Sequence, residues 1–125
     1  MKTSGRRPQR VAEAIREVVA PFLQKNVRDP RIGLVTVTRV HATPDLQRAV
    51  VYVAVHGDDA ERERTLEGLA SAAIAVRHEV GQKLRLRVVP EIVFELDKGV
   101  VHASRIASVL AQLRSLERDR EGGAT

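Results

Sequence analysis

Two valine-rich runs separated by five residues constrain the fold of this chain more than any other part of its sequence. The runs are "LVTVTRVHA" (residues 34–42) and "RAVVYVAVH" (residues 48–56), and their β-branched residues favour strands. The connecting "TPDLQ" contains a proline and an aspartate, which favour a short turn. An antiparallel hairpin is therefore the simplest pairing of the two runs.

Amphipathic helices are predicted on both sides of this hairpin. Residues 8–26 place apolar side chains at helical spacing, at Val11, Ile15, Val18, Val19, Phe22 and Leu23. Pro8 suits the first turn of a helix, whereas Pro21 should kink or loosen it. A long helix follows over residues 57–84, where Asp58 and Glu61 have the spacing of a capping box. Its apolar stripe consists of Leu66, Leu69, Ala73, Val76, Val80 and Leu84.

The C-terminal part predicts one more strand and one more helix. Residues 88–97 alternate apolar side chains, with Pro90 near the start of the strand. Residues 102–120 are expected to close the fold as a helix that packs through Ile106, Val109, Leu110 and Leu113. The predicted class is α+β, a three-stranded sheet with helices packed on one face. The other face is free to meet a partner or water.

Length and composition indicate one domain with short tails. The chain has 125 residues, of which 43% are hydrophobic and 30% charged, enough apolar side chain for a folded core. We expect a basic, flexible N-terminal segment over residues 1–7, a single domain over residues 8–115 and a disordered tail over residues 116–125.

Several classes of function find no support in the sequence. The chain has no cysteine, so disulfides and thiolate metal sites are impossible. Its four histidines lack the spacing of metal ligands, and no common nucleotide-binding or hydrolase motif occurs. No apolar run is long enough to cross a membrane. We therefore expect a cytoplasmic protein without enzymatic activity, metal, cofactor or small-molecule substrate.

The distribution of charge favours a polyanionic partner. The net charge is +5, and basic blocks at residues 1–31 and 69–90 are separated by an acidic block at residues 58–68. With only three aromatic residues, base stacking along a sheet is disfavoured, which leaves contacts to phosphates. The candidate RNA-binding residues are Arg77, Lys83, Arg85 and Arg87 at the end of the long helix, Arg28, Arg31 and Arg39 near the first strand, and Arg10 on the first helix. A solvated helix face would explain any one of them equally simply.

Several stretches together resemble the ribosome-binding factor A family, and the order of elements resembles a type II KH domain. The stretches are "RVAEAIREVVAPFL", "RDPRIGLVTVTRVHATPDLQRAVVYVAV", "LEGLASAAIAVRHEVGQKLRLRVVPEIVFELD" and "RIASVL". The resemblance implies the order helix-strand-strand-helix-(kink)-helix-strand plus a C-terminal helix. It also implies a non-enzymatic assembly factor that binds precursors of the small (30S) ribosomal subunit and their 16S rRNA, supports late RNA maturation and matters for growth in the cold. We expect a monomer.

One junction departs from the pattern that the resemblance implies. The resemblance implies an Ala-x-Gly interruption that kinks the long helix. In this sequence the interruption falls on Ala72, Ala73 and Ile74, with isoleucine in place of the glycine. Because isoleucine has less backbone freedom than glycine, we expect a weaker kink, or one set by the small residues 70–73. No RNA contact is assigned to the kink itself.

Two other functions remain open from the sequence. The chain could be a generic RNA-binding module that is not dedicated to the ribosome, or a protein-interaction module that uses the free sheet face or the basic surface. Treatment of a complex with nuclease separates the two classes, because a complex held by protein contacts alone survives it.

Overall fold

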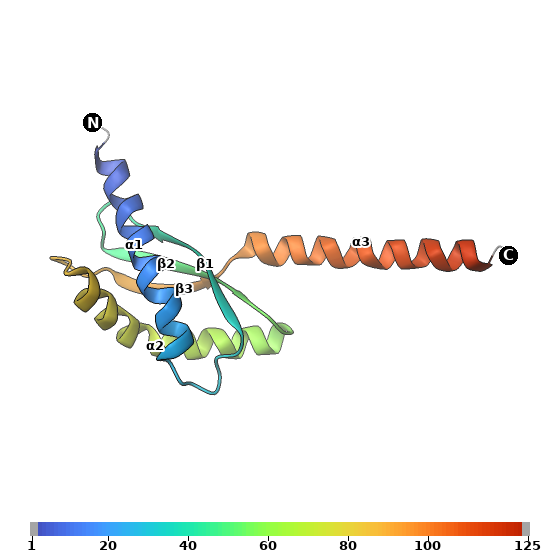
Figure 1. Ribbon diagram of the computed structural model, residues 1–125, viewed down its shortest axis with the longest axis horizontal. Helices are drawn as coiled ribbons and strands as arrows, with labels where there is room; N and C mark the ends of the chain where they lie inside the picture. The colour runs from blue at the N-terminus through green and yellow to red at the C-terminus, as the bar shows by residue number, and fades with distance from the viewer. Residues whose placement is uncertain (1–2, 124–125) are drawn as a thin grey trace.

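The computed structural model describes residues 3–123, and the side chains of residues 7–99 and 106–118. The described chain forms three helices and three strands, arranged as Figure 1 shows. In order they are α1 (Thr3–Lys25), β1 (Val35–Ala42), β2 (Arg48–Val55), α2 (Asp59–Leu84), β3 (Glu91–Leu96) and α3 (Lys98–Gly123). The predicted α+β class is confirmed.

The three strands form one mixed sheet in the order β1-β2-β3. β1 and β2 are antiparallel, as the two valine-rich runs predict, and β3 lies parallel to β2. The turn between β1 and β2 is closed by the Leu46 N–H, which donates to the Thr43 carbonyl at 2.8 Å. Asp45 accepts from the Thr43 hydroxyl and the Gln47 N–H, and these bonds lower the pKa of its carboxyl.

The hydrophobic core lies between this sheet and the helices α1 and α2. β2 points every second side chain into it, and α1 contacts both β1 and α2 while α2 contacts β3. The largest fully buried hydrophobic side chains come from α1, β2 and α2: Ile15 and Val19, Val51 and Val53, and Leu69, Val76 and Val80. The stripes predicted for α1 and α2 therefore supply the core.

The N-terminal half of α2 is fixed by a cap and by the loop before β1. Asp58 and Glu61 form both hydrogen bonds of the predicted capping box. Thr65 lies buried beneath the loop, where its hydroxyl accepts from the Gly33 N–H at 3.1 Å. Gly68 lets the loop approach, because a Cβ there would lie 2.7 Å from Ile32 Cγ1.

α2 passes through the junction at residues 72–74 without a break. The α-helix is continuous from Asp59 to Leu84, so the junction does not divide it into two helices. Its axis nevertheless bends near its middle (Figure 1). The Ile74 side chain is 83% exposed and points away from the core, so isoleucine fits here without steric conflict.

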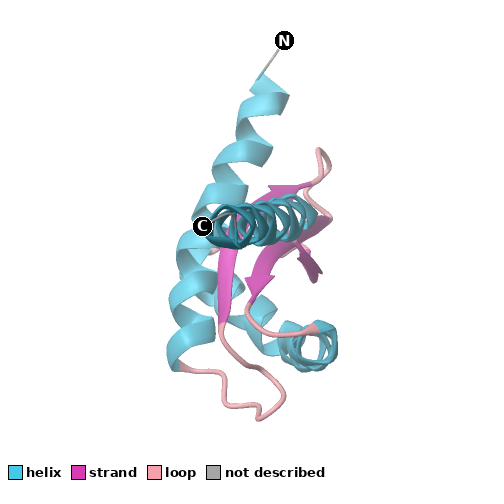
Figure 2. Cartoon of the chain, turned by 90° about the vertical axis from the view of Figure 1, so that its right-hand side faces the viewer, coloured by secondary structure: helices cyan, strands magenta, loops and turns pink. Residues whose placement is uncertain are grey.

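The expectation that the C-terminal helix closes the fold is wrong. α3 leaves the sheet as a projecting arm (Figure 1), and Figure 2 views it nearly along its axis. Its described large apolar side chains are 46–60% exposed, at Ile106, Val109, Leu110, Leu113 and Leu116. The helical face of the sheet is already covered by α1 and α2. No helix in the described part of the chain combines the length and hydrophobicity that a membrane span requires.

Asp97 sets the direction in which α3 leaves the sheet. This buried carboxylate accepts from the Thr38 hydroxyl at 2.6 Å and from the Gly99 N–H at 3.1 Å. Its own N–H donates to the Val53 carbonyl. One residue thus joins all three strands to the first turn of α3.

The terminal helices extend further than the sequence-based boundaries. α1 begins at Thr3, inside the segment expected to be flexible, so Pro8 lies within the helix rather than in its first turn. α1 also continues past Pro21 to Lys25. α3 continues to Gly123, inside the expected tail. Residues 1–2 and 124–125 lie outside the described residues.

The close approach of the loop to α2 at Gly68 predicts how a substitution there changes the stability of the fold. Ordinarily, Gly→Ala within a helix stabilises it by about 1 kcal/mol. Gly68→Ala should instead lower the free energy of unfolding by about 1–3 kcal/mol, because the new methyl group displaces Ile32. Urea unfolding measures the change. An increase in stability would show that the loop yields easily.

Candidate nucleic-acid interface

The C-terminal end of α2 is held by an arginine in an uncommon backbone conformation. Arg85 caps the helix with φ 50° and ψ 42°, and its N–H donates to the Gly81 carbonyl at 3.1 Å. Glycine is the usual residue in this left-handed conformation, which costs other residues about 1–2 kcal/mol. Leu84 and Leu86 pack against the core on either side. The cap therefore leaves the side chain of Arg85 in solvent.

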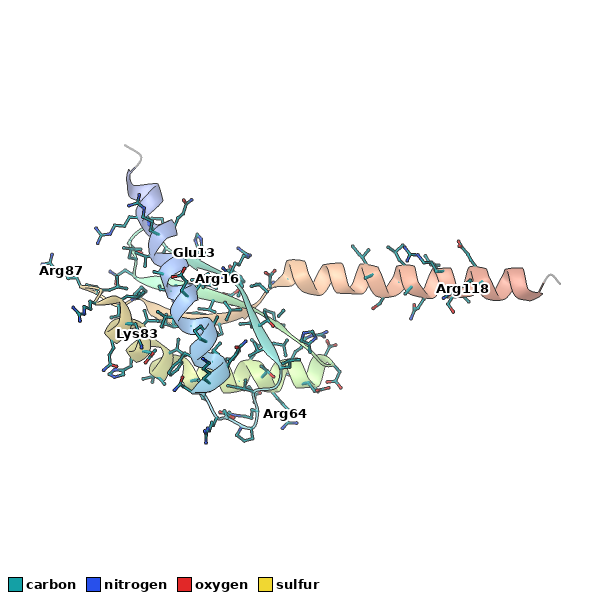
Figure 3. The ribbon with its side chains drawn as sticks, in the orientation of Figure 1. Glu13, Arg16, Arg64, Lys83, Arg87 and Arg118 are labelled. Atoms are coloured by element: carbon teal, nitrogen blue, oxygen red, sulfur yellow. The ribbon has the colours of Figure 1, made fainter. Side chains whose placement is uncertain are left out.

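The segment between α2 and β3 is clamped against the helix. Arg77 Nη2 donates to the Val89 carbonyl at 2.9 Å. A Cβ at Gly81 would lie 3.0 Å from Val89 Cγ2, so the segment approaches the helix closely. Pro90 is fully buried where β3 begins. Arg87 remains exposed on this anchored segment and points away from the domain (Figure 3).

Lys83 adds a further exposed cation to this end of α2. Its side chain is 63% exposed, and its Nζ lies 3.9 Å from Glu79, a distance at which an exposed pair contributes little. Lys83 and Lys25 line one hollow between α1 and α2, together with Glu17 and Glu79. The sequence did not single out Lys25 as a candidate, although a basic residue in the last turn of the first helix could have indicated it.

We define the α2-terminal surface as Arg77, Lys83, Arg85 and Arg87. The structure brings these four predicted residues together, because they lie on the last two turns of α2 and the clamped segment after it. α2 is polarised along its length, since its first turn carries Asp59 and Glu61 and its last turn carries Lys83. Both ends complement the helix dipole. Figure 3 shows Arg87 and Arg64 at different ends of the domain.

The predicted residues Arg28 and Arg31 lie elsewhere, in the loop between α1 and β1. Arg31 is occupied by protein contacts: it forms two hydrogen bonds to the Asp29 carboxylate, at 2.7 and 3.1 Å, and one to the Ser71 hydroxyl at 3.0 Å. The side-chain bond from Arg31 lowers the pKa of Asp29 to about 2 and raises the pKa of Arg31. These contacts favour a structural role for Arg31, while Arg28 is exposed.

Arg39 lies on the open face of the sheet, away from the α2-terminal surface. Its guanidinium stacks 3.9 Å above the centroid of the Tyr52 ring, and its Nε lies 3.7 Å from the Asp97 carboxylate. These contacts tie β1 to β2 and to the start of α3. Arg10 is exposed on the N-terminal half of α1. An RNA contact at Arg10, Arg28, Arg31 or Arg39 stays a prediction.

The chemistry of the α2-terminal surface is that of phosphate binding. Guanidinium groups donate in a fork that matches phosphate oxygens, and a clamped backbone limits the entropy lost on binding. Among the described side chains, those of residues 7–99 and 106–118, no three His, Cys, Asp or Glu gather as a metal site.

Comparison with known sequences identifies close relatives. The family model described as ribosome-binding factor A matches residues 7–110. The ribosome-binding factor A of Gemmatimonas aurantiaca is 52% identical over 117 residues, which cover 93% of this chain and 80% of that protein.

The structures of two relatives share the fold. The solution structure of a Thermotoga maritima protein described as a putative ribosome binding factor A has a TM-score of 0.64 and 36% identity, covering 71% of this chain and 85% of that one. A homology model of the Thermus thermophilus ribosome binding factor A, fitted into the cryo-EM map of its 30S complex, has a TM-score of 0.57 and 25% identity. That match covers 67% of this chain and 88% of the other.

The left-handed Arg85 predicts a gain of stability on substitution. Arg85→Gly should raise the free energy of unfolding by about 0.5–1 kcal/mol, because relief of the backbone strain exceeds the entropy that glycine adds to the unfolded chain. Urea unfolding of the variant beside the wild type measures this gain. A loss of stability would mean that the arginine side chain itself stabilises the cap.

The Asp29–Arg31 pair predicts a dependence of stability on pH. The folded pKa of Asp29 is about 2, below its unfolded value of about 3.9. The pair therefore stabilises the fold fully above the unfolded pKa, and this contribution is lost as the pH falls towards 2. Asp29→Asn should be less stable than the wild type at pH 7, and the difference should shrink below pH 4. Urea unfolding at pH 7, 5 and 3 tests it; a constant difference would contradict it.

Proposed function

The chain belongs to the ribosome-binding factor A family, and from this premise we propose that it binds the immature small (30S) ribosomal subunit and its 16S rRNA. In this proposal it acts in the cytoplasm as a monomeric assembly factor that supports late maturation of the RNA, without catalysing a reaction and without a cofactor, and it matters for growth in the cold. The 30S complex of the Thermus thermophilus relative supports the partner.

The main support for an RNA contact is Arg85, the arginine with a strained backbone at the end of α2. A glycine at residue 85 would adopt the same left-handed conformation with less backbone strain, so stability alone does not account for an arginine there. The exposed guanidinium is displayed beside Arg87 on a clamped segment. Binding to RNA phosphates would account for both exposed side chains, those of Arg85 and Arg87.

The proposed contact reads the shape and charge of the RNA rather than its bases. Sequence-specific recognition of single-stranded RNA depends strongly on aromatic stacking, for which this chain has only three aromatic residues. Phe22 and Phe94 pack against the core, and Arg39 covers the ring of Tyr52. The assembly factor would thus be positioned on a folded RNA surface through its phosphates.

Cosedimentation with purified small-subunit precursors over a salt series tests this function. Arg87→Ala should weaken binding and reduce the slope of log affinity against log salt by about 1, because one phosphate contact is lost. Arg64→Ala is the matched control, since Arg64 is an exposed arginine in the acidic half of α2.

Two outcomes would count against the proposal. If the wild type does not sediment with the precursors, the partner is wrong. If Arg87→Ala and Arg64→Ala lower affinity and salt slope equally, the particle is bound but the α2-terminal surface is not its contact.

A further inference from the structure

The turn between β1 and β2 lies at the same end of the domain as the α2-terminal surface (Figure 1). Glu91, the first residue of β3, donates its N–H to the Gln47 carbonyl at 2.9 Å, where that turn ends. In the parallel pairing of β2 with β3, Arg48 lies opposite Glu91. Arg87 belongs to the short segment that leads into Glu91, so the two Cα atoms are at most about 14 Å apart. The pairing of the strands therefore brings Arg48 close to the α2-terminal surface.

The backbone of Arg48 is held on both sides by Thr43. The Arg48 N–H donates to the Thr43 hydroxyl at 3.1 Å, and the Arg48 carbonyl accepts from the Thr43 N–H at 2.9 Å. Asp45 accepts from the same hydroxyl at 2.7 Å and fixes the other side of the turn. A cation on a backbone that is already ordered loses less entropy when it binds a ligand.

The guanidinium of Arg48 is only partly used within the domain. Its Nε donates to Glu91 Oε1 at 3.2 Å, but neither Nη atom forms a hydrogen bond with another described residue. The side chains of Arg48 and Glu91 are 58% and 62% exposed, and an ion pair so exposed adds little to stability. The N–H groups of both Nη atoms therefore remain available to a ligand.

A phosphate group fits the free side of this guanidinium. The two Nη atoms can donate to two oxygens of one phosphate, the geometry for which arginine is favoured. Base stacking has no support here, because the hollow beside Arg48 is lined by Thr43, Pro44, Asp45, Gln47 and Glu91, without an aromatic ring. RNA that is held at the α2-terminal surface can therefore reach Arg48 through its backbone.

Glu91 opposes such a contact. A phosphate at the Nη atoms of Arg48 comes close to the Glu91 carboxylate, and the two negative charges repel each other. The other carboxylate of the hollow, Asp45, is engaged by the Thr43 hydroxyl and the Gln47 N–H. Glu91 is thus the carboxylate that lies directly against the cation.

We propose that Arg48 is a further phosphate contact of the bound RNA and that Glu91 competes with the RNA for it. This inference rests on the proposed function, and it extends the RNA contact from α2 onto the start of β2. Glu91 orders the arginine in the free protein and lowers the affinity of the complex. Its replacement by a neutral residue strengthens binding, which a purely structural ion pair would not do.

Cosedimentation with purified small-subunit precursors over a salt series tests both residues. Arg48→Ala should bind about threefold more weakly and lower the slope of log affinity against log salt by about 1, because one phosphate contact is lost. Glu91→Gln should bind about threefold more tightly, because the amide still accepts from Nε but no longer repels phosphate. Both side chains are exposed, so the thermal midpoints should match that of the wild type.

Two further variants separate a local effect from a general change of charge. Asp59→Asn is the matched control, because Asp59 pairs with Arg62 at 2.9 Å at the acidic end of α2 and its replacement removes the same charge. In the double variant Arg48→Ala/Glu91→Gln, the second change should strengthen binding no more than Asp59→Asn does, because the arginine that it would release is absent.

Each outcome decides between the inference and the proposed function. If the wild type binds and Arg48→Ala keeps its affinity and salt slope, Arg48 is not a contact and only the inference fails. The inference is also overturned if Glu91→Gln binds no more tightly than Asp59→Asn, or if it gains equally with and without Arg48. If the wild type does not bind, the proposed function fails and the inference with it.

Discussion

The parallel pairing of β2 with β3 determines where the other elements lie. Two parallel neighbours require a crossover, and α2 provides it by running back along the helical face of the sheet. With 26 residues α2 is about 39 Å long, whereas the six residues of β3 span only about 20 Å. The helix is longer than the sheet it covers. Its last two turns pack against the core through Val80 and Leu84 and carry the α2-terminal surface on their exposed side, and Arg77 clamps the return to β3.

The elements could be predicted from the sequence because they depend on local patterns. Alternating valines gave the hairpin, helical spacing gave the buried faces of α1 and α2, and the spacing of Asp58 and Glu61 gave a cap. The course of α3 could not be predicted this way. A stripe of apolar residues predicts a helix that needs a partner, but it does not say whether that partner lies within the chain.

Part of the candidate site was also predictable, because its residues are close together in the sequence. Clustering in sequence located the four residues of the α2-terminal surface, since neighbours on one helix end stay neighbours in space. It could not show that Arg31 is held by Asp29 and Ser71, or that Arg39 stacks on Tyr52, because such pairs form only when distant segments meet. Nor does composition reveal the left-handed backbone of Arg85.

The central claim is that the C-terminal end of α2 faces the RNA and the acidic end does not. Because the chain has no cysteine, single cysteines at the exposed positions 82 and 63 can each carry an iron chelate that generates hydroxyl radicals. The two positions are about 28 Å apart on α2. On bound small-subunit precursors, Gln82→Cys should direct cleavage of 16S rRNA at a few neighbouring sites, and Glu63→Cys should direct little. Equal or stronger cleavage from position 63 would contradict the account.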